Sequence, residues 1–204
     1  MATFFYFLLF FENCVIIVVC DYAGVSFYKC SIAYNSLKFS KKRRKFDMAS
    51  VDIKYINPFV KATITVMDML GMTGGKLGKP SLSDMKFPDN AFLIQVGVTG
   101  GMKGQVIIGL TEQKAKDTAS IMMMGMPVEN LDEMACSALG ELGNMIMGNT
   151  STIFSTMNIV FDITPPLSMH GYEIKLQAET TAIKIPILIN DTEHLSIYIC
   201  INEN

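Results

Sequence analysis

The chain has 204 residues and a mass of 22.6 kDa, which suits one globular domain with a sizeable core rather than two domains of ordinary size. Half of the residues are apolar, and residues 48–204 carry 10 Lys, no Arg and 16 acidic groups, a sum of −6. An acidic domain without arginine lacks the clustered cations that bind phosphate backbones, so we do not expect nucleic acid as a partner.

Residues 1–47 differ in composition from the rest. They hold eight of the 13 Phe, whereas 15 of the 16 Met lie from Met48 onward. Glu12 and Asn13 divide the first apolar stretch into runs far shorter than the roughly 20 residues that a bilayer core requires. The apolar-then-basic order, ending in KKRRK, still fits an anchor that faces inward. We favour upstream translation: residues 1–47 would be a non-native or disordered extension, residues 48–204 the domain, and Met48 the true start.

Three elements follow in the first part of the domain. Residues 51–72 have apolar side chains at three- to four-residue spacing, which predicts an amphipathic helix ending at Gly71. The Gly-, Pro- and Ser-rich segment 73–84 is expected to be a loop. Residues 91–110 form two β-rich runs around Gly100-Gly101, which predicts a hairpin.

The second part alternates helices with strands. Residues 111–126 predict a helix capped by Thr111 and ending at Gly125, in which the methionine run is expected to fill the core. A longer helix should begin near Asn130. Three further strands are expected in 158–166, 179–190 and 194–202, the last two joined as a hairpin. Helices with a mainly antiparallel sheet predict an α+β fold.

Cysteine and histidine give no sign of a metal site. Within 48–204 only Cys136 and Cys200 occur, without CxxC spacing. His170 and His194 are the only histidines, and both are expected at the surface or in loops. We therefore expect no zinc site, no disulfide framework and no cofactor bound by the protein itself.

The long third helix carries a polar stripe. At about 100° per residue, Ser137, Glu141, Asn144 and Gly148 share one face, opposite a set of apolar residues: Ala135, Leu139, Leu142 and Ile146. A polar pair opposite an apolar stripe is typical of any surface helix. The flanking glycines, Gly140, Gly143 and Gly148, are less usual, because each interior glycine costs on the order of 1 kcal/mol relative to alanine. They suggest that another backbone approaches this face.

The segment LDEMACSALGELGNMIMGN, followed by FDITPP and IKIPILI, resembles the CheC, CheX and FliY family of chemotaxis phosphatases. The family motif is Ser or Asp, then Glu, then Asn, with a later proline; here these are Ser137, Glu141, Asn144 and the pair Pro165-Pro166. The resemblance runs from about residue 53 to the C-terminus, and a single motif copy is similar to the CheX members. Both prolines are expected to shape a strand end rather than to touch substrate.

The resemblance implies a phosphatase that acts on the aspartyl phosphate of the response regulator CheY. It implies that Glu141 docks to the regulator, and the neutral amide of Asn144 suits the orientation of an attacking water. Ser137, Gly140 and Gly148 are possible partner contacts. The resemblance also implies Mg²⁺ carried by the regulator, a homodimer and a cytoplasmic location. The apolar strand 194–202 also predicts a homodimer, because an open edge of this strand would otherwise invite uncontrolled pairing.

Two alternatives remain open from the sequence. One is a non-catalytic interaction module of the same fold, such as a flagellar switch domain, which lacks the Glu and Asn pair. The other is a membrane-anchored scaffold, which rests on residues 2–20 alone.

Overall fold

The computed structural model describes residues 6–11, 14–19, 53–178 and 181–203. The chain divides into two units, Met1–Lys45 and Phe46–Asn204. In the first unit, β1 (Tyr6–Phe11) and β2 (Cys14–Val19) pair as antiparallel strands. The rest of the predicted extension, residues 1–47, lies outside the described residues, apart from this hairpin.

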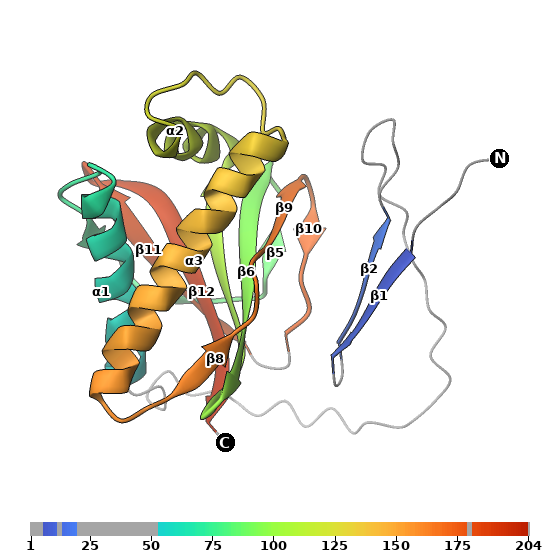
Figure 1. Cartoon of the computed structure of the whole chain (residues 1–204), viewed down its shortest axis with the longest axis vertical. Coiled ribbons are helices and arrows are strands. Elements are labelled where there is room, and N and C mark those ends of the chain that lie inside the picture. Colours follow the sequence, from blue (N-terminus) through green and yellow to red (C-terminus); the bar gives the residue numbers. More distant parts are fainter. Residues whose placement is uncertain (1–5, 12–13, 20–52, 179–180, 204) are drawn as a thin grey trace. The chain divides into compact units, whose positions relative to one another are not determined.

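The second unit is built on an antiparallel sheet with the strand order β3-β11-β12-β7-β6-β8, in which β4 also pairs with β11 and β9 also pairs with β6 (Figure 1). On the central strands, buried side chains point alternately to the two faces of the sheet, so both faces are packed. The strands are β3 (Lys76–Leu77), β4 (Ser81–Ser83), β6 (Ala91–Gly100), β7 (Met102–Thr111), β8 (Phe161–Ile163), β9 (Leu167–Gly171), β11 (Ala182–Ile189) and β12 (Thr192–Glu203).

The predicted α+β class is confirmed, as is the hairpin around Gly100-Gly101. Two expectations about the sheet are wrong. The expected loop 73–84 contains β3 and β4, which pair with β11. The strand expected to have an open edge, β12, lies between β11 and β7, so both of its edges are paired. The edge argument for dimerisation therefore does not hold.

Helices α1 (Ile53–Met69) and α3 (Glu133–Thr156) pack on each other and cover one face of the sheet (Figure 1). The main core lies between these layers. In this core Phe154, from the last turn of α3, contacts Phe59 and Phe161, with ring centroids 5.5 Å apart in each pair. Helix α1 ends two residues before the predicted Gly71, which adopts a positive φ of 81° in the turn that follows. No helix in the described part of the chain is long and apolar enough to cross a membrane.

The opposite face of the sheet buries a smaller cluster. Leu93 and Ile107 alternate along their strands with residues of the main core and point to this second face. A short ribbon of β5 (Lys86–Phe87) and β10 (Ile174–Lys175) contributes Phe87, which packs edge-on against Tyr198 at 5.1 Å. Burial raises the pKa of Tyr198 to about 12.

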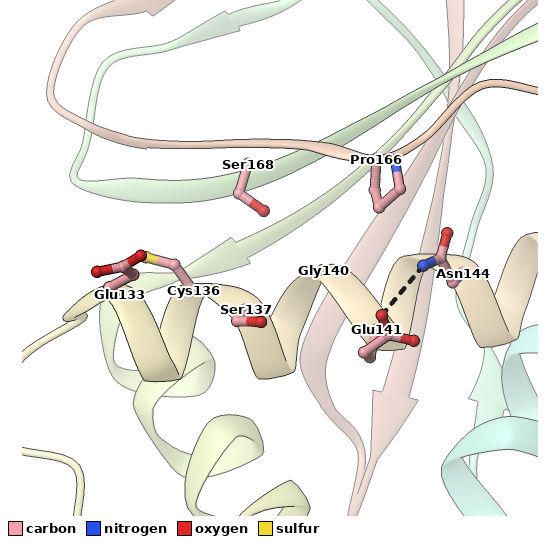
Figure 2. A pocket seen from close by; sticks show the side chains of 8 residues that line it. All are labelled: Glu133, Cys136, Ser137, Gly140, Glu141, Asn144, Pro166 and Ser168. Carbon is pink, nitrogen blue, oxygen red and sulfur yellow. Dashed lines mark hydrogen bonds between the residues drawn. The ribbon is translucent and has the colours of Figure 1, made fainter. Parts of the chain in front are cut away.

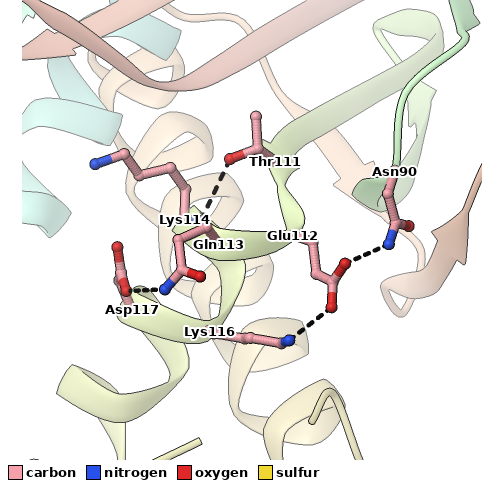
Figure 3. A network of polar contacts seen from close by, with 7 residues as sticks. All are labelled: Asn90, Thr111, Glu112, Gln113, Lys114, Lys116 and Asp117. Atoms are coloured by element: carbon pink, nitrogen blue, oxygen red, sulfur yellow. Dashed lines mark hydrogen bonds and ion pairs between the residues drawn. The ribbon is translucent and has the colours of Figure 1, made fainter. Parts of the chain in front are cut away.

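Helix α2 (Glu112–Met122) begins as the sequence predicts, with the Thr111 hydroxyl accepting from the Lys114 backbone N–H at 3.3 Å. Figure 3 shows the polar network around this end, in which Glu112 accepts from Lys116 at 2.6 Å and from Asn90. The lysine contact is the main reason why the pKa of Glu112 is lowered. An anion in the first turn also favours the helix dipole.

The methionine run does not fill the core as expected. The helix ends at Met122, and Met124 is 100 % exposed and Met126 51 % exposed. The reason is that the chain turns at Met124 and Gly125, which both have positive φ, so the residues after Met123 leave the helix and are exposed. Only Met122 of the run packs partly against the core.

His194 is buried, which corrects the expectation of a surface or loop position. The pairing of β11 with β12 shifts at Ile187/Leu188, and His194 is the residue that this shift leaves unpaired. Its Nε2 lies 3.0 Å from the Thr118 hydroxyl, which donates to the Lys114 carbonyl at 2.7 Å, so Nε2 is the donor to Thr118. His170 lies exposed on β9, as expected of a surface residue, and stacks on Phe92.

Burial, with a smaller contribution from Lys114, lowers the pKa of His194 below its ordinary value of 6.5, and Asp117 opposes this only in part. The unfolded chain therefore binds a proton at a higher pH than the folded chain does. We expect the free energy of unfolding to fall as the pH drops below about 6.5, until the folded-state pKa is passed. Urea titrations of the wild type and His194→Gln between pH 5 and 7.5 measure this. An equal pH slope in both proteins would contradict the assignment.

Candidate active site

Helix α3 supplies the polar stripe. It begins at Glu133, three residues after the predicted start near Asn130, because Asp132 caps it by accepting from the Ala135 backbone N–H at 2.9 Å. The apolar stripe predicted from the helical spacing is completely buried: Ala135, Leu139, Leu142 and Ile146. This burial fixes the rotation of the helix about its axis and turns the opposite face outward.

The predicted site residues lie on that outward face. Ser137 and Glu141 are exposed, and Asn144 is half-buried. The Asn144 amide donates from Nδ2 to Glu141 Oε1 at 3.3 Å (Figure 2). Because an amide carries two N–H donors and a carbonyl acceptor, this contact occupies only one of the three groups that Asn144 offers.

A surface hollow brings these side chains together with residues from another element. Figure 2 shows α3 on one side and the segment carrying Pro166 and Ser168 on the other. Eight residues line the hollow: Glu133, Cys136, Ser137, Gly140, Glu141, Asn144, Pro166 and Ser168. Of the predicted residues, only Gly148 is not among those that line it. Gly148 is exposed, and nothing lies within 4 Å of the place that a Cβ would occupy there.

Pro166 is part of the hollow, whereas the sequence predicted only that it shapes a strand end. Thr164 holds the turn before it, donating its backbone N–H to the Gly97 carbonyl at 3.0 Å and accepting from the Gly97 N–H at its hydroxyl at 2.9 Å. This pairing places the prolines between β8 and β9, next to α3.

The glycines of α3 explain how the two sides approach. A Cβ on Gly143 would lie 2.7 Å from Ile94 Cγ2 and 3.7 Å from Pro166 Cβ, and one on Gly140 would lie 3.9 Å from Pro166 Cγ. What approaches Gly143 is therefore a side chain of the chain's own sheet, not the backbone of a partner. Any larger residue at 143 would force α3 away from β6 and would displace Asn144 with it.

Sequence reasoning missed Glu133, Cys136 and Ser168. Glu133 could have been predicted, since it precedes Ser137 by four residues and Glu141 by eight, and residues at this spacing share a helix face. Ser168 could not have been predicted from the sequence, because only the pairing of β9 with β6 brings it opposite α3.

The chemistry of the hollow is that of neutral and anionic groups. Its eight described lining residues include two carboxylates, Glu133 and Glu141, and no cationic side chain. Burial, and to a lesser degree Asp132, raise the pKa of the Cys136 thiol, which therefore stays protonated and is a poor nucleophile. No group of three potential metal ligands among His, Cys, Asp and Glu occurs in the described part of the chain. The arrangement suits the positioning of a water, not covalent catalysis.

Comparison with known proteins identifies the family of the chain. A family model described as chemotaxis phosphatase CheX matches residues 92–194, a range that includes α3, Pro166 and Ser168. The chain belongs to the CheX family. It is 32% identical over 153 residues, 74% of this chain and 97% of the relative, to the CheY-P phosphatase CheX of Thermotoga maritima.

Two solved structures of CheX proteins each match 74% of this chain. The CheX crystal structure from Desulfovibrio desulfuricans has a TM-score of 0.64 and 25% identity, covering 74% of this chain and 100% of that one. The CheX of a CheX–CheY–BeF₃–Mg²⁺ complex from Borrelia burgdorferi has a TM-score of 0.63 and 30% identity, with coverage of 74% and 100%.

Proposed function

We propose that this protein is a phosphatase that hydrolyses the aspartyl phosphate of a CheY-type response regulator. The observation that carries the proposal is the outward-facing pair of Glu141 and Asn144 on α3, in a chain of the CheX family. A switch or interaction module of the same fold would not need this pair. The relative from Thermotoga maritima is a CheY-P phosphatase, and the structure from Borrelia burgdorferi contains a CheY.

The reaction requires little from the phosphatase. A water oxygen attacks phosphorus, the bond between phosphorus and the aspartyl oxygen breaks, the aspartate leaves as a carboxylate, and inorganic phosphate is released with the proton from water. Mg²⁺ carried by the regulator supports this by neutralising charge on the phosphoryl oxygens. The protein's task is to hold the water in line with the leaving oxygen.

Asn144 fits this task. Its amide offers a free donor and a free acceptor beside the contact with Glu141, so it can hold a water in a fixed direction. Because the amide is neutral, it adds no negative charge next to the phosphoryl group. It cannot act as a base, so the proton of the attacking water leaves with the phosphate.

Glu141 fits a docking role. A carboxylate would repel a phosphoryl group but would form a charge-assisted contact with a lysine on the regulator. Glu141 is exposed and has no cation among the other residues that line the hollow, so it is available for such a contact. Ser137, one turn before Glu141, and Gly140, immediately before it, line the same hollow and would contact the regulator next to Glu141.

A homodimer and a cytoplasmic location are further parts of the proposal. Both rest on the family resemblance. The strand-edge argument for the dimer is lost, because β12 is paired on both sides. Light scattering at working concentration tests the dimer, and a strictly monomeric protein would refute it.

The proposal as a whole is tested by mixing the purified protein with a Mg²⁺-loaded phosphorylated regulator and following the loss of phosphate. We expect a rate well above that of the regulator alone. No acceleration with any CheY-type regulator of the same cell would leave the protein as a binding module.

A further inference from the structure

The edge of β6 that faces away from β7 is interrupted next to the candidate active site. The chain pairs with this edge twice, as β8 at residues 98–100 and as β9 at residues 91–95. In the gap between the two pairings, residues 164–166 lie opposite residues 96 and 97 of β6. An extra residue on one side of an antiparallel pair is a bulge, which bends the chain and redirects its side chains. This bulge carries Pro166, which lines the hollow opposite α3 (Figure 2).

Thr164 closes the gap with its side chain. In an ordinary antiparallel ladder, two facing residues exchange two backbone hydrogen bonds. Here the Thr164 N–H donates to the Gly97 carbonyl at 3.0 Å, but the Gly97 N–H donates to the Thr164 hydroxyl at 2.9 Å. The hydroxyl takes the place of the backbone carbonyl. A single side chain therefore completes the pairing of β6 at the bulge.

Gly97 permits this close approach. A Cβ at this position would lie 2.9 Å from Thr164 Cγ2 and 3.1 Å from Thr164 Oγ1. The φ of Gly97 is not positive, so the lack of space, and not an unusual backbone conformation, favours glycine here. A larger residue at position 97 would push Thr164 away from β6, because a packed interior has no room to absorb the added methyl group.

The two prolines transmit the position of Thr164 to the site. A proline ring fixes its own φ and restricts the residue before it, so the segment 164–166 is stiff. Pro166 lies against α3, with its Cβ 3.7 Å from the place that a Cβ on Gly143 would occupy. Asn144 follows Gly143 directly and lines the same hollow as Pro166 (Figure 2). Thr164 therefore sets the position of the wall beside the Asn144 amide.

The Asn144 amide is only weakly held by its hydrogen bond to Glu141. That bond is 3.3 Å long, beyond the roughly 2.7–3.2 Å of an ordinary N–H···O bond, and Glu141 is exposed. In the proposed function Glu141 also pairs with the regulator, so a second restraint on the amide is needed. The Pro166 ring has no polar side-chain atom, so it can limit rotation of the amide without occupying its donor or acceptor.

We propose that Thr164 is a positioning residue for the phosphatase reaction. By pairing with Gly97 it holds Pro166 against α3, and Pro166 keeps the Asn144 amide directed at the attacking water. This inference rests on the proposed function. It assigns to Thr164 an effect on turnover and not on affinity for the regulator.

Thr164→Val tests the inference, because valine has the shape of threonine but lacks the hydroxyl that accepts from Gly97. Regulator treated with beryllofluoride and Mg²⁺ is the binding probe. We expect the kcat for phosphate loss to fall roughly tenfold, while the Kd for the probe stays within about twofold. Thr164→Ser keeps the hydroxyl and should restore most of the kcat.

Thr192→Val is the matched control. The Thr192 hydroxyl donates to the Ile189 carbonyl at 2.8 Å in the turn between β11 and β12, and β7 and β6 separate β12 from β9. Both valine variants lose one hydrogen bond of a hydroxyl to the backbone, so their melting temperatures should fall by similar small amounts. Only Thr164→Val should lose turnover. Relaxation of the side-chain ¹⁵N of Asn144, measured by NMR, should show added mobility in Thr164→Val and not in Thr192→Val.

A second pair of variants tests the contact from the side of β6. Gly97→Ala places a methyl group 2.9 Å from Thr164 Cγ2, so it should also lower the kcat. Thr164→Ser removes Cγ2, so the double variant should turn over faster than Gly97→Ala alone. A double variant no faster than Gly97→Ala would contradict a direct contact between the two residues.

The outcomes separate this inference from the proposed function. Active wild type with an unchanged kcat in Thr164→Val, or with an equal loss in Thr192→Val, would overturn the inference alone. Failure of Thr164→Ser to restore turnover would do the same. A higher Kd with unchanged kcat would make the bulge a docking element and would also refute the inference. Inactive wild type would overturn it together with the proposed function.

Discussion

Replacing Asn144 with alanine is expected to remove nearly all of the acceleration of phosphate loss while leaving regulator binding largely intact. Alanine cannot hold a water in line with the leaving oxygen, and misplacement of a reacting group by about 1 Å can cost a hundredfold in rate. We expect at least this loss in kcat. The side chain is half-buried opposite the core stripe, so the melting temperature should change little. Single-turnover phosphate release and titration with beryllofluoride-treated regulator measure the two quantities separately.

Two further variants sharpen this experiment. Asn144→Gln keeps the amide but moves it by one methylene, so it should recover little activity if position is what matters. Asn149→Ala removes another amide of α3, one that donates to the Met145 carbonyl at 2.8 Å and does not line the hollow, and should behave as wild type. Wild-type turnover in Asn144→Ala, or a loss explained by unfolding, would show that the stripe is only a docking face.

Replacing Glu141 with alanine is expected to act mainly on binding. A hydrogen bond to a charged group contributes about 1.5–3 kcal/mol, so the Kd for the regulator should rise roughly tenfold to a hundredfold. Turnover should fall less, as orientation relaxes. The difference between wild type and variant should shrink as salt is raised, because ions screen an exposed charge pair.

A second variant separates the effect of the Glu141 charge from the effect of its hydrogen bond. Glu141→Gln keeps the shape and the hydrogen-bonding capacity and loses only the charge, so it isolates the electrostatic part. Glu173→Gln changes the net charge equally at an exposed position between β9 and β10 and serves as the control for long-range attraction. Equal weakening by the two glutamine variants would rule out a specific ion pair at Glu141.

The parts of the fold that the sequence predicts well are those with a regular period. The buried stripe of α3 repeats every three to four residues, so the helix and its outward face could be assigned from the sequence alone. The hairpin of β6 and β7 was equally clear, because two apolar β-rich runs flank a glycine pair. Helix α3 carries Glu141 and Asn144, which is why the central pair of the site could be named.

What the sequence did not predict depends on distant or irregular contacts. β3 and β4 consist of Lys, Leu and Ser, and only pairing with β11 makes them strands. His194 is buried by a register shift that leaves no local pattern. The turn at Met124, just after α2 ends, was missed because the left-handed position normally requires glycine, and Gly125 follows immediately. Ser168 joins the hollow only through the pairing of β9 with β6.

The outward direction of the Glu141–Asn144 pair has a consequence for selectivity. The hollow contributes an amide and carboxylates but no positive group to hold a free phosphate, so the protein carries only half of a reaction centre. The other half, with its metal ion and its aspartyl phosphate, arrives on the substrate. Small acyl phosphates, which bring neither a folded surface nor a bound metal, should remain untouched at concentrations that saturate most phosphatases. Signal termination would then depend on two proteins recognising each other, which protects the cell's metabolic acyl phosphates from wasteful hydrolysis.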